Sequence, residues 1–447
     1  MNTQNTQNSA SPELTRRTFL KTTSTLAAAA SLAPGVFAAG DDTLKVALIG
    51  CGGRGAEAAS QALTTAGAVK LVAMADVDKE HLDAKYDAIK QIHPDRVEVP
   101  EENKFIGFDA YQHAIALADV AILTTPPGFR PSHFEEAVRQ GKHVFMEKPV
   151  AVDAPGIRKV LAAAEDAKKK NLKVGVGFQR HHQTVYLETV QRLHDGAIGD
   201  IVSMRCYWDT PGVWVHTRKS LQEKLGRAPT EMEYQLYDWY YFLWLCGDHI
   251  VEQHVHNLDV INWVKKAHPV RAWGMGGREL RRGIDHGQIF DHHYVEFEYA
   301  DSEALGMHSR LSSQCRHMDG CWENVSEHVR GTKGSCDVGR GRIEGENKWH
   351  FTGKGNDPYQ QEHNDLFAAI RNDTPYNETA LYGAYSTMTA ILGRMATYSG
   401  VEVAWDDAIN SQIDTFPKAL GWDAEPPVKP DANGRYPIPV PGVTKPF

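Results

Sequence analysis

Residues 44–55 read Leu-Lys-Val-Ala-Leu-Ile-Gly-Cys-Gly-Gly-Arg-Gly, and this stretch decides the fold of the first half of the chain. Its first six residues form a short apolar run that predicts a buried strand. Gly50, Gly52 and Gly55 then follow at the spacing of a phosphate-binding loop, and residues 55–66 predict a helix. In such a loop Gly50 permits the tight turn, Gly52 lets the backbone approach a pyrophosphate, and Gly55 lets helix and sheet pack closely. The stretch therefore predicts a dinucleotide-binding unit.

Asp76 supports this reading and suggests which dinucleotide binds. It ends the next apolar run, residues 68–75, about twenty residues beyond the loop. A carboxylate there accepts hydrogen bonds from both ribose hydroxyls and repels a 2′-phosphate, so we expect NAD, with NADP less favoured. The predicted cofactor contacts of this unit are Gly50, Gly52, Gly53, Arg54, Gly55 and Asp76. The alternative, a glycine-rich turn without a ligand, does not explain a strand, a helix and an acid in register.

Strand-like and helix-like runs alternate from the loop to residue 178. The expected strands are 119–125, 142–146 and 173–178, and the expected helices are 79–91, 131–140 and 154–170. This alternation predicts an α/β Rossmann domain with a doubly wound parallel sheet over residues 42–178. Ligands bind at the carboxyl ends of such strands, where Thr125, Pro126 and His133 follow one strand and Glu147-Lys148-Pro149 follows the next.

After residue 179 the pattern changes to strands in runs with fewer helices. Strands are expected at 201–207, 270–275, 292–299, 304–311, 326–331 and 335–338, and helices at 184–195, 248–264, 360–371 and 380–399. Residues 179–415 therefore predict an α+β domain with a largely antiparallel open sheet. Residues 416–447 are rich in Pro and Gly and predict an extended tail on the surface.

Residues 15–21, Thr-Arg-Arg-Thr-Phe-Leu-Lys, precede an Ala-rich run and a small-x-small site near Ala38. This order is typical of a twin-arginine export signal over residues 1–38, the alternative being an ordinary amphipathic helix. The signal predicts recognition by the export machinery and a periplasmic or other extracytoplasmic location. Its apolar run is short and mild, so we expect no stable membrane span. Because that route carries folded proteins, the cofactor would be loaded before export.

Composition restricts the partners. Charged residues make up 23% of the chain and the net charge is −9, which argues against nucleic acid, since phosphate binding needs a basic face. The six cysteines form no Cys-x-x-Cys pair, although a Cys315–Cys321 or Cys321–Cys336 bridge stays open. We expect a homo-oligomer.

The Glu147-Lys148-Pro149 motif after a glycine-loop domain resembles the Gfo/Idh/MocA oxidoreductases, named for glucose-fructose oxidoreductase and inositol dehydrogenase. In that family the lysine of the motif reaches the nicotinamide end of the cofactor and the substrate hydroxyl, and the match gives this role to Lys148. An ammonium there stabilises the alkoxide that develops during hydride transfer. Residues 330–334 and 383–388 also resemble the family, so the likeness runs from about residue 44 to 400.

The family places an acid and, four residues later, a His or Tyr on one helical face, and these positions read Glu252 and His256. His256 titrates near neutrality and suits a general base or acid. Glu252 orients it or contacts the substrate, although the family more often has Asp there. A metal site from His254 and His256 with Asp248 or Glu252 is disfavoured, because His-x-His on a helix points the two rings apart. We therefore predict no metal.

The substrate side of the site is predicted from the resemblance and from aromatic residues. Arg180 and His182 follow the last strand of the first domain, at a junction that borders the substrate in the family, and Asn257 adjoins His256. Aromatic residues around 208–214 and 234–244 can stack on sugar faces, though they are as easily core.

Three functions remain open. The first is an exported NAD(H)-dependent oxidoreductase acting on a CH–OH group of a sugar or sugar derivative, with tightly held cofactor. The second is a redox-neutral enzyme, either an NAD-dependent glycosidase or a sugar–sugar oxidoreductase. The third is a cofactor-bound binding protein without turnover.

Overall fold

A computed structural model describes residues 42–300 and 308–447, and its first layer is a six-stranded parallel sheet in the order β3-β2-β1-β4-β5-β6. The strands are β1 Leu44–Ile49, β2 Val69–Asp76, β3 Lys104–Ile106, β4 Val120–Leu123, β5 His143–Met146 and β6 Val174–Val176. The order reverses between β1 and β4, which is the arrangement of a Rossmann sheet. The predicted doubly wound domain is confirmed.

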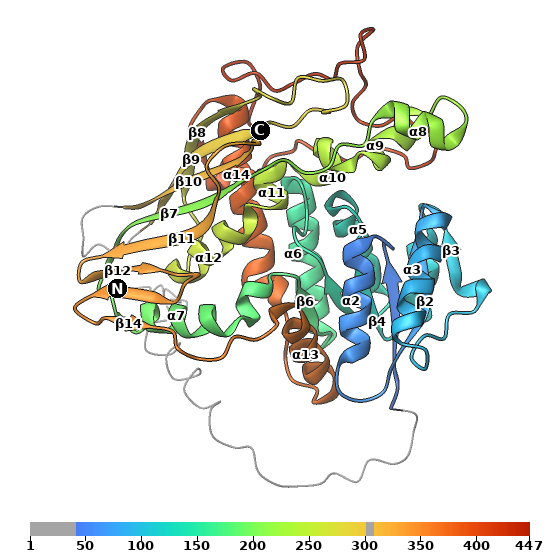
Figure 1. Ribbon diagram of the computed structural model, residues 1–447, viewed down its shortest axis with the longest axis horizontal. Helices are drawn as coiled ribbons and strands as arrows, with labels where there is room; N and C mark the ends of the chain where they lie inside the picture. Colours follow the sequence, from blue (N-terminus) through green and yellow to red (C-terminus); the bar gives the residue numbers. More distant parts are fainter. Residues whose placement is uncertain (1–41, 301–307) are drawn as a thin grey trace, which may run out of the picture. The chain divides into compact units, whose positions relative to one another are not determined.

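Helices cover both faces of this sheet (Figure 1). One face packs on α2 Gly53–Thr64, α3 Lys79–Ile92 and α13 Pro358–Arg371, and the other on α4 Ala110–Ala116, α5 Arg130–Arg139 and α6 Ala154–Lys169. The alternate side chains of β1 explain the two cores, since Val46 and Leu48 face one layer while Ala47 and Ile49 face the other. Short 3₁₀ turns lie at η1 Glu101–Asn103, η2 Pro127–Phe129 and η3 Gln179–His182.

The second sheet has nine strands in the order β14-β13-β12-β11-β7-β10-β9-β8-β15. Its strands are β7 Ile201–Thr210, β8 Arg271–Gly277, β9 His292–Tyr299, β10 Ser309–His317, β11 Asn324–Gly331, β12 Gly334–Asp337, β13 Arg342–Gly345, β14 Trp349–His350 and β15 Val403–Ala404. Only the β7–β10 pair is parallel among these neighbours. The predicted α+β domain with a largely antiparallel sheet is confirmed.

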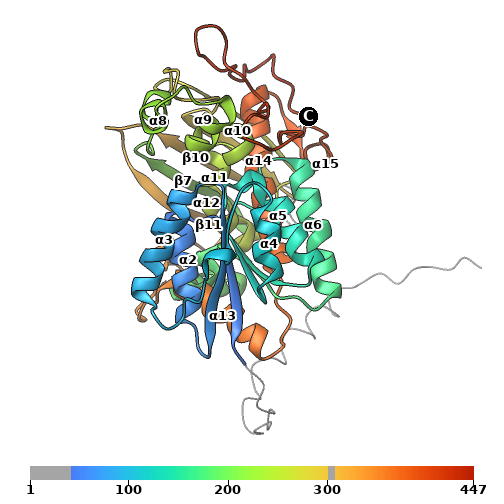
Figure 2. The ribbon, with the colours of Figure 1, turned by 90° about the vertical axis from the view of Figure 1, so that its right-hand side faces the viewer.

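One face of this sheet carries helices that connect it to the Rossmann domain. These are α7 Thr184–His194, α12 Val255–Lys265, the π-helical turn η6 Thr379–Gly383, and α14 Ala384–Ser399. All but one residue of α14 are buried, because it packs on β8 and β9 on one side and on α6 on the other. Figures 1 and 2 show α12 and α14 between the sheet and α6.

Residues 211–247 form a helical segment near the edge of the cofactor domain. It contains α8 Arg218–Leu225, α9 Glu231–Tyr237, η4 Trp239–Tyr241 and α10 Leu243–Cys246, followed by α11 His249–Glu252. Lys224 of α8 lies 3.4 Å from Asp78 and 3.0 Å from Glu80 of the Rossmann domain. After α15 Trp405–Ile409 the tail has no helix or strand and packs on this segment, where Thr230 donates to the Trp422 carbonyl at 2.7 Å.

Some sequence expectations need correction. The helix expected over 248–264 is two helices, α11 and α12, with a break at Gln253 and His254. The strand expected at 304–311 is β10 at 309–317, and residues 304–307 lie outside the described residues. The short elements β3, α4, β13, β14 and β15 were not anticipated, because they are too short to show a period.

Three further expectations concern cysteines, membranes and export. All six cysteines are free, so neither bridge considered above is formed. None of the helices within 42–300 and 308–447 is both long and apolar enough to cross a membrane. The predicted export signal lies outside the described residues.

Candidate functional site

The glycine loop joins β1 to α2 and has the geometry of a phosphate cradle. Gly50 has φ +93°, and a Cβ on it would lie 2.6 Å from the Thr125 backbone nitrogen. A Cβ on Gly55 would lie 2.1 Å from the Gly50 carbonyl oxygen, so both positions require glycine. A Cβ on Gly52 or Gly53 would meet nothing within 4 Å. Space therefore remains beside the start of α2, where the helix has no side-chain cap and no acidic residue in its first turn.

Asp76 closes the same loop from the end of β2. Its Oδ2 accepts from the Cys51 N–H at 2.5 Å, and its Oδ1 accepts from the Asp78 N–H at 3.0 Å. Burial raises the pKa of Asp76, although these two N–H groups counteract it. Each oxygen keeps further acceptor capacity, so the carboxylate can still receive ribose hydroxyls.

Thr125, Pro126 and His133 follow β4 at the carboxyl edge of the sheet. The His133 Nδ1 lies 3.3 Å from the Thr125 hydroxyl, and Pro126 precedes η2. Burial, with the Arg130 charge, lowers the pKa of His133 to about 3, so this ring is neutral. It stacks on Tyr111 at 4.1 Å.

Arg130 was not anticipated from the sequence, yet its hydrogen bonds stabilise this edge of the sheet. Its guanidinium is 1% exposed and donates to the carbonyls of Leu123 at 2.5 Å and Thr125 at 2.8 Å. Burial lowers the pKa of Arg130 to about 10, against the raising effect of Glu147 and Glu252. A buried cation therefore stands close to both carboxylates of the site.

Arg54 links the glycine loop to the Glu147-Lys148-Pro149 motif. Its Nε donates to Glu147 at 2.5 Å and its terminal nitrogen to Glu362 of α13 at 3.0 Å. Burial and the Glu147 charge raise the pKa of Glu362 well above its usual value, although Arg54 and His182 counteract this. Glu362 is a second member of the site that the sequence did not reveal, since it lies over three hundred residues from Arg54.

Lys148 lies at the centre of the candidate site. Its ammonium donates to the Glu252 backbone carbonyl at 2.6 Å and to Glu252 Oε1 at 3.1 Å. The break between α11 and α12 makes the first bond available. In a continuous helix the Glu252 carbonyl would accept from the His256 N–H, but that N–H donates to Gln253 at 3.2 Å instead. The interrupted helix thus turns a backbone carbonyl toward Lys148.

His256 stands beside Lys148 without a partner for its Nδ1 among the described residues. Its ring lies 5.9 Å from the ring of Phe178, edge-on, and 5.9 Å from that of Trp208, nearly parallel. Burial, the Lys148 ammonium and the Arg180 guanidinium hold the pKa of His256 well below its ordinary value. The imidazole is therefore neutral near pH 7 and able to accept a proton.

Arg180 and Asn257 meet at a buried carboxylate, Glu327 of β11, which the sequence did not single out. Arg180 pairs with Glu327, Asn257 donates to the same oxygen at 2.5 Å, and the Tyr186 hydroxyl donates to the other at 3.1 Å. Glu327 is fully buried, so these contacts fix the positions of both predicted substrate residues. The Asn257 Oδ1 remains without a partner in the described part of the chain.

His182 lies apart from these groups, between two carboxylates. Its Nδ1 is 2.6 Å from Asp365 and its Nε2 is 3.0 Å from Glu378. Burial alone would lower the pKa of His182, but the hydrogen bonds to Asp365 and Glu378 outweigh it and raise this pKa to about 10. This charged imidazole joins η3 to α13 and η6, and its partners are Asp365 and Glu378 rather than the Lys148–Glu252 pair.

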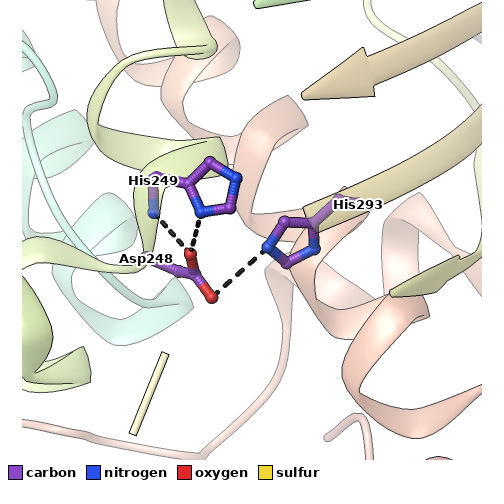
Figure 3. Close-up of side chains that lie close together, drawn as sticks. All are labelled: Asp248, His249 and His293. Atoms are coloured by element: carbon purple, nitrogen blue, oxygen red, sulfur yellow. Dashed lines mark hydrogen bonds and ion pairs between the residues drawn. The ribbon is translucent and has the colours of Figure 1, made fainter. Parts of the chain in front are cut away.

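The fully buried side chains of Asp248, His249 and His293 also converge (Figure 3). Asp248 accepts from the His249 N–H at 2.5 Å and Nδ1 at 2.7 Å, and from the Tyr398 hydroxyl at 2.5 Å. Burial alone would raise the pKa of Asp248, but His293 and His249 outweigh it and hold this pKa well below its usual value. Because protein donors already serve this carboxylate, the cluster acts as a junction of α11, β9 and α14.

His254 and His256, the two histidines of the metal site considered above, have different surroundings. His254 contacts Ser313 at 2.7 Å, whereas the His256 ring lies 5.9 Å from the rings of Phe178 and Trp208. The candidate site thus combines an open glycine loop, the Asp76 carboxylate, the Lys148 ammonium and the neutral imidazole of His256.

Comparison with known proteins agrees with this geometry. Residues 44–178 match the family model GFO_IDH_MocA, described as oxidoreductase family, NAD-binding Rossmann fold. Inositol 2-dehydrogenase of Ralstonia nicotianae is 28% identical over 251 residues, covering 55% of this chain and 61% of that protein. The protein from Burkholderia cenocepacia with the same name is 30% identical over 229 residues, covering 50% and 54%. The chain thus spans about three fifths or less of the length of these curated relatives.

Solved structures extend the likeness to both domains. An aldose-aldose oxidoreductase from Caulobacter crescentus has a TM-score of 0.61 at 16% identity, covering 81% of this chain and 99% of that one. A scyllo-inositol dehydrogenase from Lactobacillus casei, solved with NAD(H) and scyllo-inositol, has a TM-score of 0.58 at 21% identity, with the same coverage. Residues 44–178 therefore match the NAD-binding Rossmann model of that oxidoreductase family, and the two domains together have the fold of these solved structures.

Proposed function

We propose that the protein is an NAD(H)-dependent oxidoreductase that transfers hydride to or from a CH–OH carbon of a sugar or sugar derivative. The observation that carries this proposal is Lys148, whose ammonium pairs with the Glu252 carboxylate at 3.1 Å and whose charge also lowers the pKa of the His256 imidazole. Inositol dehydrogenases among the relatives add support, since inositols are polyols like sugars.

The residues fit the cofactor by their own geometry. The space beside Gly52 and the uncapped start of α2 suit a pyrophosphate, and Asp76 suits the adenosine ribose. We infer NAD rather than NADP because a 2′-phosphate beside Asp76 would meet a half-buried carboxylate. When bound, the nicotinamide accepts or returns the hydride at the sugar carbon.

The chain's own residues then handle the proton and the charge. His256, neutral near pH 7, accepts the hydroxyl proton when the alcohol is oxidised and returns it in the reverse direction. The Lys148 ammonium stabilises the negative charge that grows on the substrate oxygen. Glu252 holds Lys148 by two contacts, through its carbonyl and its carboxylate, and so keeps the ammonium beside the reacting bond. Arg180 and Asn257, held by Glu327, are the proposed contacts for neighbouring hydroxyls.

The twin-arginine sequence favours a second candidate, a redox-neutral cycle. An exported enzyme is cut off from a pool of free NAD, so it would hold its cofactor and restore it in every turnover. A sugar–sugar oxidoreductase or an NAD-dependent glycosidase works in this way. The ion pairs of Lys224 with Asp78 and Glu80 support retention of the cofactor. They link α8 to the Rossmann domain at Asp78, two residues beyond Asp76. From the sequence alone, we also propose that the protein is recognised by the export machinery, lies outside the cytoplasm and forms a homo-oligomer.

Absorbance near 340 nm tests the hydride step. Protein purified in folded form is mixed with candidate sugars, and the bound cofactor is followed in a single turnover. We expect a rise for a net dehydrogenase and a transient rise for the closed cycle. A protein that binds the cofactor but shows no change with any sugar would be the non-catalytic binding protein.

A further inference from the structure

Trp214 is an exposed tryptophan on a rigid support close to the candidate site. It lies four residues beyond the end of β7 and is 42% exposed. Its ring stacks on His216 with centroids 4.2 Å apart and planes within 18°. The His216 ring is itself fixed, because its Nδ1 lies 2.8 Å from the Tyr237 carbonyl and its backbone N–H donates to Asp238 at 2.8 Å. The indole is therefore held in one orientation rather than free on the surface.

Two further rings complete an aromatic patch that we define as Trp214, Trp239 and Tyr240. Trp239 and Tyr240 meet Trp214 edge-on, with centroids 5.9 Å and 6.1 Å from it. Edge contacts support the indole while leaving its second face uncovered by these two rings. The Tyr240 hydroxyl and the Asp238 Oδ2 nearby are buried and have no hydrogen-bond partner among the described residues.

The aromatic patch is continuous with the candidate site. Tyr240 lies 6.0 Å from the ring of His317, whose Nε2 contacts Gln253 at 2.6 Å. Gln253 follows Glu252, the partner of Lys148. Burial and then the Glu252 charge raise the pKa of Tyr240 well above its usual value.

Trp208 provides a second connection along the same strand. It lies six residues before Trp214, nearly parallel to His256, and its indole N–H has no partner among the described residues. Trp208 therefore adds an aromatic ring beside the proposed proton acceptor. A pyranose ring has an apolar C–H face that stacks on an exposed indole such as Trp214.

We propose that the aromatic patch is a subsite for a second sugar ring, so that the substrate is a glycoside or oligosaccharide whose terminal ring reacts at Lys148 and His256. This inference rests on the proposed function and adds the substrate class. Trp322 provides a matched control, because it is 60% exposed and its ring contacts Tyr207 edge-on instead of a ring of the aromatic patch.

The test uses the NAD-loaded full chain, the best monosaccharide of a panel, and the 1,4-linked disaccharide that carries the same sugar at its non-reducing end. We expect the disaccharide to have a KM lower than that of the monosaccharide by on the order of tenfold. Trp214→Ala should remove this advantage and leave the monosaccharide kinetics unchanged, whereas Trp214→Phe should restore part of it. Trp322→Ala should change neither.

Equal KM values for the two sugars in the wild type, or a Trp214→Ala variant that still prefers the disaccharide, would overturn the subsite. If no sugar is turned over, the proposed function fails, and calorimetry of disaccharide binding to the NAD-loaded protein decides the subsite separately. Binding that Trp214→Ala weakens sustains the subsite, and an absence of binding overturns it.

Discussion

Replacing Lys148 by Met removes the ammonium on which the proposed chemistry depends and keeps an unbranched side chain of similar length. The substitution deletes the contacts to the Glu252 carbonyl at 2.6 Å and to its Oε1 at 3.1 Å. Loss of one preorganised donor at a developing oxyanion typically lowers kcat by about 10²–10³, or roughly 2.7–4 kcal/mol of barrier. The half-buried Glu252 carboxylate also loses its partner, at a cost of about 1–3 kcal/mol in folding free energy. We therefore expect a folded but less stable protein with a strongly reduced hydride step.

A second readout separates electrostatics from misfolding. The Lys148 charge is one of the causes that hold the pKa of His256 below its ordinary value, so Lys148→Met should raise that pKa. Single-turnover absorbance near 340 nm measures the rate, and NMR titration of the imidazole signals measures the pKa. Lys159→Met on the surface of α6 is the matched control and should change neither. A rate for Lys148→Met within threefold of the wild type, with the cofactor bound, would refute the role assigned to this lysine.

Three other perturbations test the cofactor cradle and the charged histidine. Gly52→Ala should weaken NAD binding and leave the melting temperature of the cofactor-free protein unchanged. Gly50→Ala should lower that melting temperature, because a Cβ at position 50, unlike one at position 52, meets the Thr125 backbone. Equal changes in melting temperature for the two variants, measured by calorimetry, would contradict this geometry. Asp76→Asn should reduce the preference for NAD over NADP in equilibrium binding, and an unchanged ratio would remove Asp76 from the ribose site. The pKa of His182 is raised to about 10, so its ion pairs stabilise the fold fully below about pH 6.5, and this contribution is lost as pH rises toward 10, by about 1.4 kcal/mol per pH unit. Chemical denaturation should show that the free energy of unfolding falls more between pH 7 and pH 9 in the wild type than in His182→Asn. Equal falls in the two proteins would contradict this role of His182.

Sequence reasoning works where a local pattern has a local cause. The glycine loop and Asp76 were predictable because the backbone turn, the close approach at Gly55 and the end of β2 all lie within a single βαβ unit. The alternation of strands and helices also predicted the parallel sheet, since each run is long enough to show its period. Lys148 came from the resemblance, which the sequence carries in three adjacent residues.

The rest of the site depends on contacts between distant segments. Glu327 binds Asn257 from seventy residues away, and Glu362 binds Arg54 from over three hundred, so no spacing could reveal either. The break after Glu252 was also hidden, because an apolar and polar pattern continues through it. It arises where tertiary contacts compete with the helix, since Lys148 takes the Glu252 carbonyl.

The central claim is that a cofactor held in the glycine loop exchanges hydride with a sugar carbon beside Lys148 and His256. The most direct measurement is single-turnover absorbance near 340 nm on the purified protein, with its bound cofactor identified by mass spectrometry after denaturation. The account predicts bound NAD whose absorbance changes when the sugar is added, and a change slowed by about 10²–10³ in Lys148→Met. A protein that binds no NAD, or one whose bound NAD responds equally in wild type and Lys148→Met, would contradict it.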